Sequence, residues 1–300
     1  MKLVCVLADT TWAIGRVHQT IADAFAGEYE FVFHRDSCYY PHLLAADFER
    51  CDIFLTLFEL FEGLMSNFLK GKDLRKVLFI AHGFLDWTFI KEHSFSQGPH
   101  YCTISNSVTE SFPAPIRWTP SGINPRAFEY TPRSGKIQKM GWCGAVFPEG
   151  DSKRVSWSYK IAEKAGIDLS IASKLPFSEM NSWYHSIDVF VVTAGPYVHT
   201  ETGPLPPFEA VLCGVPVIGT RVGNFRLLPG PKFSTIEEAV AILEDLKAHP
   251  EKAVALAKEQ YEDVIANWTV TAVLPRWRET FEAVINSEPK LIGSLDLQRL

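Results

Sequence analysis

The stretch "HTETGPLPPFEAVLCGVPVIGT" (residues 199–220) joins a proline-rich loop to an apolar segment. Two glutamates, Glu201 and Glu209, are separated by seven residues, and these include three prolines and one glycine. The part "PPFEAVLCG" predicts a short helix that ends at Gly214, and "VPVIGT" predicts a buried strand. The order of loop, helix and strand is typical of an α/β sheet protein.

Short apolar runs alternate with helical patterns on the N-terminal side of this stretch. Helices are predicted at residues 14–25, 155–166 and 177–186, and strands at 2–8, 29–34, 51–57, 76–82, 100–105, 137–142, 168–173 and 188–193. Short continuous apolar strands between helices indicate parallel sheets that are covered on both faces. The run at 53–65 predicts a strand that leads into an amphipathic helix. Residues 235–286 are predicted to be helical.

A proline-rich segment interrupts this alternation. Residues 111–135 hold five prolines and two glycines, and no long periodic pattern crosses them. We therefore predict two Rossmann-like α/β lobes, at residues 1–125 and 126–268, followed by a terminal helix and tail at 269–300. In each open sheet, the ligand crevice is expected beyond the carboxyl ends of the strands.

The composition limits the class of function. The net charge of −6 argues against general binding to a nucleic-acid backbone, although a local basic groove remains compatible with it. The six cysteines form no C-x-x-C pair, which favours reduced thiols, a cytoplasmic location and no structural zinc. No signal peptide or membrane-spanning run is predicted, and peripheral attachment to a membrane is the alternative. The sequence contains no D-x-D motif, so it does not support a phosphate site of the kind in which such a motif holds a metal ion.

Two residues of the first lobe stand where predicted strands end. Gly15 is the single glycine after the first strand, so no G-x-G-x-x-G motif for a dinucleotide is present. The loop at Gly15 is either a plain strand–helix turn or a helix start that approaches a substrate. His82 ends the predicted strand at 76–82, and at this position a histidine can contact a sugar or move a proton. A buried structural histidine is an equally good interpretation of His82.

The second lobe offers cations and carboxylates. Lys153 and Arg154 can neutralise a phosphate. The alternative is that they are solvated on the surface, which is more common for adjacent lysine and arginine residues. Carboxylates accept hydrogen bonds in pairs from the vicinal hydroxyls of ribose and hexoses, whereas Glu209 alone could also complement a helix dipole.

The prolines remove N–H donors from the start of the predicted helix. Among the residues of this loop, the amides of Thr202, Gly203 and Leu205 are then left to grip a phosphate, with Pro204 stiffening the loop between them.

These residues resemble a known family. The segment "ETGPLPPFEAVLCGVPVIGTRVGN" resembles the Glu-x7-Glu signature of the retaining GT-B glycosyltransferases of family GT4, also called glycosyl transferases group 1. Five further segments resemble motifs of the family in the same order: "IAHGF", "TISNSVTESF", "TPSGINPRAF", "WYHSIDVFVVTA" and "NWTVTAVLPRWRETFEAVI". The resemblance implies a GT-B fold, in which two Rossmann-like lobes face a central cleft and a C-terminal helix crosses back to the first lobe.

The resemblance also implies a role for each candidate residue. Glu209 would hold the ribose of a nucleotide-sugar donor, and Glu201 and His82 would act at the transferred sugar as the catalytic pair. The other donor-binding candidates are Gly15, Lys153, Arg154, Thr202, Gly203, Pro204 and Leu205. A hexosyl or pentosyl group would pass to an acceptor hydroxyl with retention of configuration, without metal or other cofactor. The acceptor would be a glycan, a lipid-linked sugar or a small molecule.

Two departures from the family pattern affect the phosphate site. Trp142 stands where the family often has arginine, and Arg154 is expected to supply that charge. Pro204 replaces a glycine of the signature. Three alternative functions stay open: transfer of sugar to modified DNA bases, as in phage enzymes, a non-catalytic protein that binds nucleotide sugars, and a nucleotide-sugar epimerase.

Overall fold

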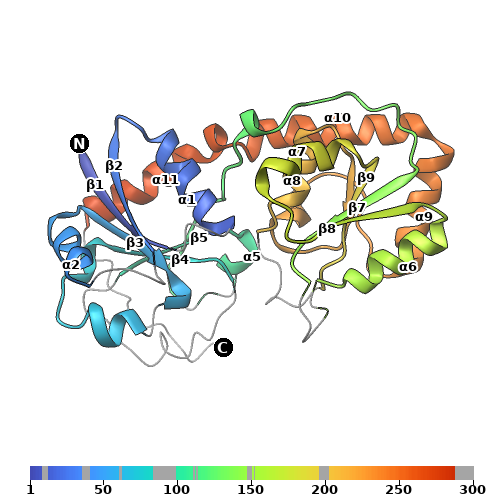
Figure 1. The fold of residues 1–300 in the computed structure, drawn as a ribbon. Helices are drawn as coiled ribbons and strands as arrows, with labels where there is room; N and C mark the ends of the chain where they lie inside the picture. The colour runs from blue at the N-terminus through green and yellow to red at the C-terminus, as the bar shows by residue number, and fades with distance from the viewer. Residues whose placement is uncertain are drawn as a thin grey trace. The chain divides into compact units, whose positions relative to one another are not determined.

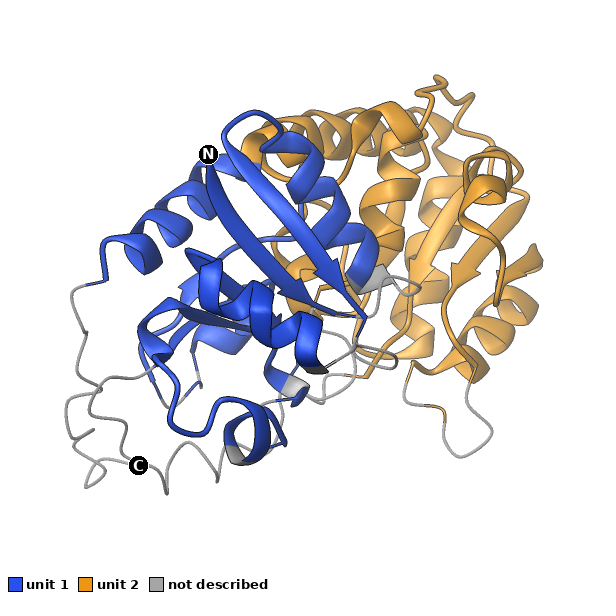
Figure 2. Cartoon of the chain, turned by 60° about the vertical axis from the view of Figure 1, so that its left-hand side comes forward, with its two compact units in different colours: residues 1–122, 273–300 blue, residues 123–272 orange. Residues whose placement is uncertain are grey.

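A computed structural model describes residues 1–8, 13–35, 41–60, 63–83, 99–110, 112, 114–146, 151, 153–195 and 203–287. The chain forms two compact units, which are coloured separately in Figure 2. Unit 1 comprises residues 1–122 and 273–300, and unit 2 comprises residues 123–272. The sequence places these divisions at residues 125 and 268 instead. No helix in the described ranges is long and apolar enough to cross a membrane.

Unit 1 contains a parallel sheet of six strands in the order β2-β1-β3-β4-β5-β6 (Figure 1). Its strands are β1 (Lys2–Leu7), β2 (Tyr29–His34), β3 (Ile53–Leu57), β4 (Val77–Ala81), β5 (His100–Thr103) and β6 (Arg117–Trp118). Its helices are α1 (Ala13–Ala24), α2 (Pro41–Arg50) and α5 (Asn106–Thr109), with shorter turns η1 (Phe58–Leu60), η2 (Leu64–Phe68) and η3 (Leu74–Lys76). Strands β3 and β4 are buried along their whole length, as expected for central parallel strands.

Helix α11 (Val270–Ile285) starts in unit 2 and continues in unit 1. In unit 1 the indole Nε1 of Trp277 donates a 2.9 Å hydrogen bond to the carbonyl oxygen of Pro120. The ring of Phe281 lies 5.4 Å from that of Phe25, the residue directly after α1. These buried aromatic contacts fix the last helix to the N-terminal sheet layer.

Unit 2 contains a parallel sheet of four strands in the order β10-β9-β7-β8. Its strands are β7 (Lys139–Cys143), β8 (Asp168–Ala172), β9 (Val189–Val192) and β10 (Val217–Gly219). Its helical segments are η4 (Pro125–Ala127), α6 (Val155–Ala165), α7 (Phe177–His185), α8 (Pro206–Leu212), η5 (Gly223–Leu227), α9 (Ile236–Ala248) and α10 (Pro250–Asn267).

Helices cover both faces of the unit 2 sheet. Val189 and Val191 of β9 pack in one core with residues of α6 and α9, which lie beside each other in Figure 1. On the opposite face, Phe190 meets the rings of Trp183 and Tyr184 from α7 at centroid distances of 6.2 Å. Successive side chains of β9 point to opposite faces of the sheet, and both faces are covered by helices. This explains why β9 is apolar at every position.

The local structure differs from the sequence analysis at one predicted helix, and it contains one strand that the sequence analysis did not predict. The amphipathic helix expected after β3 is replaced by η1 and η2, the second of which is a single π-helical segment. No long periodic pattern crosses the proline-rich segment at 111–135, yet β6 pairs with β5 within it. A two-residue edge strand lacks the length that a periodic pattern needs, so its sequence carries no strand signal.

Candidate functional site

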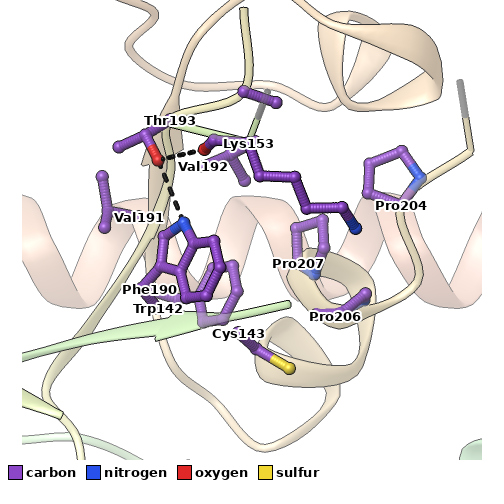
Figure 3. A pocket seen from close by; sticks show the side chains of 11 residues that line it. Trp142, Cys143, Lys153, Phe190, Val191, Val192, Thr193, Pro204, Pro206 and Pro207 are labelled. Atoms are coloured by element: carbon purple, nitrogen blue, oxygen red, sulfur yellow. Dashed lines mark hydrogen bonds between the residues drawn. The ribbon is translucent and has the colours of Figure 1, made fainter. Parts of the chain in front are cut away.

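A pocket in unit 2 lies where the direction of strand connection reverses. From β7 the chain passes to β8 on one side and returns to β9 on the other, and β7 and β9 pair through Gly141 and Phe190. The pocket at this point is lined by Trp142, Cys143, Lys153, Phe190, Val191, Val192, Thr193, Ala194, Pro204, Pro206 and Pro207 (Figure 3). Ligands of open α/β sheets bind at such reversal points, beyond the carboxyl ends of the strands.

Lys153 brings a positive charge to this pocket. Its side chain extends across the pocket toward Pro204 in Figure 3. Its main chain is anchored to the end of β9, because the hydroxyl of Thr193 donates a 2.9 Å hydrogen bond to the carbonyl oxygen of Lys153. The same hydroxyl accepts a 3.0 Å hydrogen bond from Nε1 of Trp142. The lysine therefore emerges from a fixed point at the rim of the sheet.

Arg154 takes a different direction from its neighbour. It has a left-handed backbone, with φ of 50° and ψ of 47°, immediately before α6. Its guanidinium lies 4.4 Å from the ring centroid of Trp157 and packs against Gly195, just past β9. A left-handed conformation costs about 1–2 kcal/mol for a residue with a side chain. The turn at Arg154 thus places one cation in the pocket and the other beside the end of β9.

Helix α8 begins at Pro206, as the sequence predicts. Pro206 and Pro207 have no N–H group, and the N–H groups of Phe208 and Glu209 both donate to the carbonyl oxygen of Leu205, at 3.0 and 3.1 Å. In most helices, the N–H groups of these first four positions are unpaired and can bind an anion. At α8 none of the four is available, so an anion would have to be bound by side chains or by the preceding loop.

Glu209 lies buried in the first turn of α8, with 4% of its surface exposed. The phenol of Tyr184 in α7 donates a 2.8 Å hydrogen bond to its Oε2 atom. Burial and the adjacent Glu209 carboxylate raise the pKa of Tyr184 well above its usual value, so the phenol stays protonated and remains a donor. The pair is therefore a fixed donor–acceptor contact between α7 and the first turn of α8.

Arg133 ties together the helices that carry this pair. Its guanidinium donates to the carbonyl oxygens of Tyr184 and His185 at the end of α7, at 3.1 and 3.2 Å. It also donates to the carbonyl oxygen of Cys213 after α8, at 3.3 Å. A cation at two helix C-termini is favourable because the helix dipoles are negative there. Arg133 thereby fixes α7 relative to α8.

The candidate residues of unit 1 lie at the start of α1 and after β4. Gly15 is buried in the first turn of α1. His82 and His18 are buried, and their ring centroids lie 5.8 Å apart. Burial lowers the pKa of His18 to about 4, and burial together with His18 lowers the pKa of His82 well below its usual value. Both imidazoles are therefore neutral at physiological pH.

The structure brings together only some of the predicted residues. Lys153 and Pro204 line one pocket, flanked in the chain by Arg154, Gly203 and Leu205. Glu209 lies on the adjoining helix, although it is not part of the pocket wall. Glu201 and Thr202 lie outside the described residues, so their predicted roles stay predictions.

Comparison with known proteins finds one family match, in the C-terminal part of the chain. Residues 144–279 match the family described as glycosyl transferase-like. The match spans somewhat less than half of the chain. No curated protein matches the chain.

The whole chain has the fold of solved GT-B glycosyltransferases. A sucrose-phosphate synthase from Thermosynechococcus elongatus is 12% identical, with a TM-score of 0.67 over 95% of this chain and 100% of that one. HepE from Anabaena, solved with UDP-glucose, is 11% identical, with a TM-score of 0.68 over 94% and 100%. The catalytic domain of starch synthase IV from Arabidopsis thaliana, bound to ADP and acarbose, is 10% identical, with a TM-score of 0.68 over 96% and 100%.

Two residues at the unit 2 site were missed by the sequence reasoning. Thr193 stands at the carboxyl end of β9, so the rule of inspecting strand ends could have found it. Tyr184 has no such signal, because an aromatic residue at helical spacing is indistinguishable from a core residue. Its role becomes visible only when α7 and α8 are packed and its phenol meets Glu209.

Proposed function

We propose that the protein transfers a sugar from a nucleoside diphosphate sugar to an acceptor hydroxyl. The observation that carries the proposal is the pocket at the β7–β9 reversal point, where Lys153 faces the proline-started helix that bears Glu209. A lysine suits a diphosphate, and a buried carboxylate suits the paired hydroxyls of ribose. The similarity of residues 144–279 to glycosyl transferase-like proteins supports this assignment of roles.

The proposal includes transfer without a metal ion. A diphosphate leaving group gains negative charge as its bond to the sugar breaks, and this charge must be stabilised. Lys153 at the pocket wall and Arg154 beside Gly195 supply two positive charges at the ends of β7 and β9. Activity that persists in excess EDTA supports this part of the proposal, and activity that returns only with added Mg²⁺ or Mn²⁺ overturns it.

The proposal also includes retention of configuration. The bond between the anomeric carbon and the phosphate oxygen breaks, and the acceptor oxygen bonds to the same face of the sugar. The leaving phosphate takes the proton of the acceptor hydroxyl, so no protein nucleophile is required. Glu201 and His82 stay the predicted contacts to the transferred sugar on the strength of the family resemblance. Proton NMR of the product tests retention, because α and β anomers differ in their coupling constants.

A screen of nucleotide sugars tests the proposed function. UDP-, GDP- and ADP-sugars are added in a thermal-shift assay, and a donor at about 100 times its Kd should stabilise the protein by about 2.7 kcal/mol. The donor that binds is then incubated with candidate glycans, lipid-linked sugars and small alcohols. Release of nucleoside diphosphate that depends on the acceptor supports the proposal.

Other outcomes separate the alternatives. Binding without turnover points to a nucleotide-sugar sensor, and release of nucleotide without a glycoside points to an epimerase. Turnover only on modified DNA points to a DNA glycosyltransferase. Absence of binding to any nucleotide sugar contradicts the proposed function.

A further inference from the structure

We infer that Trp142, acting through Thr193, is a positioning residue for Lys153. The inference rests on the proposed function, in which Lys153 meets the diphosphate of the donor. It is carried by two hydrogen bonds that share one hydroxyl: Nε1 of Trp142 donates to Thr193 Oγ1 at 3.0 Å, and Thr193 Oγ1 donates to the Lys153 carbonyl oxygen at 2.9 Å (Figure 3).

The direction of this relay follows from the chemistry of its members. An indole N–H can only donate and a carbonyl oxygen can only accept, whereas a hydroxyl does both. The Thr193 hydrogen is therefore committed to Lys153, and an oxygen lone pair faces Trp142. Trp142 and Thr193 are 2% and 1% exposed, so solvent does not compete for the bond between them. In a buried site, each bond polarises and strengthens the next.

The relay holds the backbone from which the Lys153 side chain projects. The chain reverses in the next residue, where Arg154 has a φ of 50°. A small shift of the Lys153 carbonyl would therefore redirect the ammonium group. The Lys153 stem also lies beside the indole: a Cβ at Gly144 would stand 2.9 Å from Cη2 of Trp142 and 3.1 Å from Cδ of Lys153. Trp142 thus supports both the backbone and the stem of the lysine.

Trp142→Phe tests the relay, because it keeps an aromatic ring and removes the N–H donor. Isothermal titration with UDP, GDP and ADP gives diphosphate affinity, and ligand-observed NMR gives the affinity of the matching nucleoside. The loss of one hydrogen bond is expected to weaken diphosphate binding about fivefold. Nucleoside affinity should stay unchanged, since the nucleoside has no phosphate for Lys153 to meet.

Three variants make the test specific. Thr193→Val removes the hydroxyl with little change of shape and should reproduce the loss, and it also serves if Trp142→Phe fails to fold. Thr193→Ser restores the hydroxyl and should restore affinity. Trp183→Phe is the matched control, because Nε1 of Trp183 donates to Ser170 Oγ at the same 3.0 Å distance without a link to Lys153. It should leave diphosphate affinity unchanged.

A Lys153→Ala background decides between positioning and general structure. If Trp142 acts through the lysine, Trp142→Phe causes no further loss of diphosphate affinity in that background. An equal further loss, or an equal loss for the nucleoside, overturns the inference. If the native protein binds a diphosphate that Lys153→Ala loses while Trp142→Phe does not, the proposed function stands and the inference falls. If the native protein binds no nucleoside diphosphate, both fall.

Discussion

The phenol of Tyr184 donates a 2.8 Å hydrogen bond to Oε2 of Glu209, and this bond joins α7 to the first turn of α8. Both side chains are buried, so the carboxylate is oriented before any ligand arrives. Such preorganisation reduces the entropy lost when a ligand binds. The central claim of the proposed function is that this oriented Glu209 carboxylate accepts hydrogen bonds from the hydroxyls of a nucleotide ribose.

Tyr184→Phe is expected to lower the free energy of unfolding by about 1.5–3 kcal/mol, because a buried carboxylate loses its hydrogen-bond donor. Urea unfolding measures this change. Tyr159→Phe is the control, because Tyr159 is 58% exposed and its hydroxyl can be solvated by water. Equal stability of the two variants would show that the bond between Tyr184 and Glu209 contributes little.

Lys153→Ala is expected to raise the donor KM by tenfold or more, since a charge-assisted hydrogen bond contributes about 1.5–3 kcal/mol. Lys164→Ala is the matched control. Lys164 pairs with Glu237 on the surface at 2.8 Å and lies outside the pocket. Its removal should leave KM unchanged. Similar KM values for both variants would remove Lys153 from the donor site.

The stability of the protein is expected to fall below neutral pH, and His18 is one cause. The pKa of His18 is about 4 in the folded protein, below the usual 6.5. As pH falls through 6.5, His18 therefore becomes protonated in the unfolded chain while it stays neutral in the folded protein. The free energy of unfolding should fall by about 2 kcal/mol between pH 8 and pH 5 from this group alone.

The His18→Gln variant isolates that contribution. Its side chain does not titrate, so its stability should decline less steeply over the same pH interval. His82 titrates in the same direction and remains in both proteins, which makes the difference in slope the informative quantity. Parallel pH profiles of stability would exclude the assigned role of His18. Neither ring nitrogen of His18 meets a hydrogen-bond partner in the described part of the chain.

Gly214, which ends α8, is expected to tolerate no side chain. Its φ is 78°, and a Cβ there would collide with the carbonyl oxygen of Thr131. Gly166 ends α6 with a φ of 60° but has open space around the same position. Gly166→Ala should cost about 1 kcal/mol from backbone strain alone, and Gly214→Ala clearly more. Equal losses by thermal unfolding would mean that the chain at Thr131 moves aside.

The order of strands and helices in unit 2 follows from the sequence because its apolar runs are short, continuous and separated by helical periodicity. The start of α8 at Pro206 and its end before Gly214 are encoded by residues with special backbone requirements. Strand β6 and helix α2 were not predicted. The first is too short for a periodic pattern, whereas the second carries apolar residues at Leu43, Leu44 and Phe48 and could have been found from the sequence.

The candidate site was only partly accessible to sequence reasoning. Lys153 could be named because it follows a strand end, and Glu209 because of its spacing from Glu201. The different directions of the Lys153 and Arg154 side chains could not be predicted, because they depend on the left-handed backbone at Arg154. The anchoring of Lys153 by Thr193 joins residues 40 positions apart and appears only once β9 lies beside the loop after β7.

Binding of matched ribose and dideoxyribose nucleotides tests the central claim most directly. The nucleoside diphosphate that binds and its 2′,3′-dideoxy analogue are titrated calorimetrically into the native protein and into Glu209→Gln, which keeps an oxygen acceptor for Tyr184. The native protein is predicted to prefer the ribose form by about tenfold or more, from lost hydrogen bonds to a charged group. Glu209→Gln is predicted to lose most of that preference. An undiminished preference in Glu209→Gln would contradict the assignment of Glu209 to the ribose.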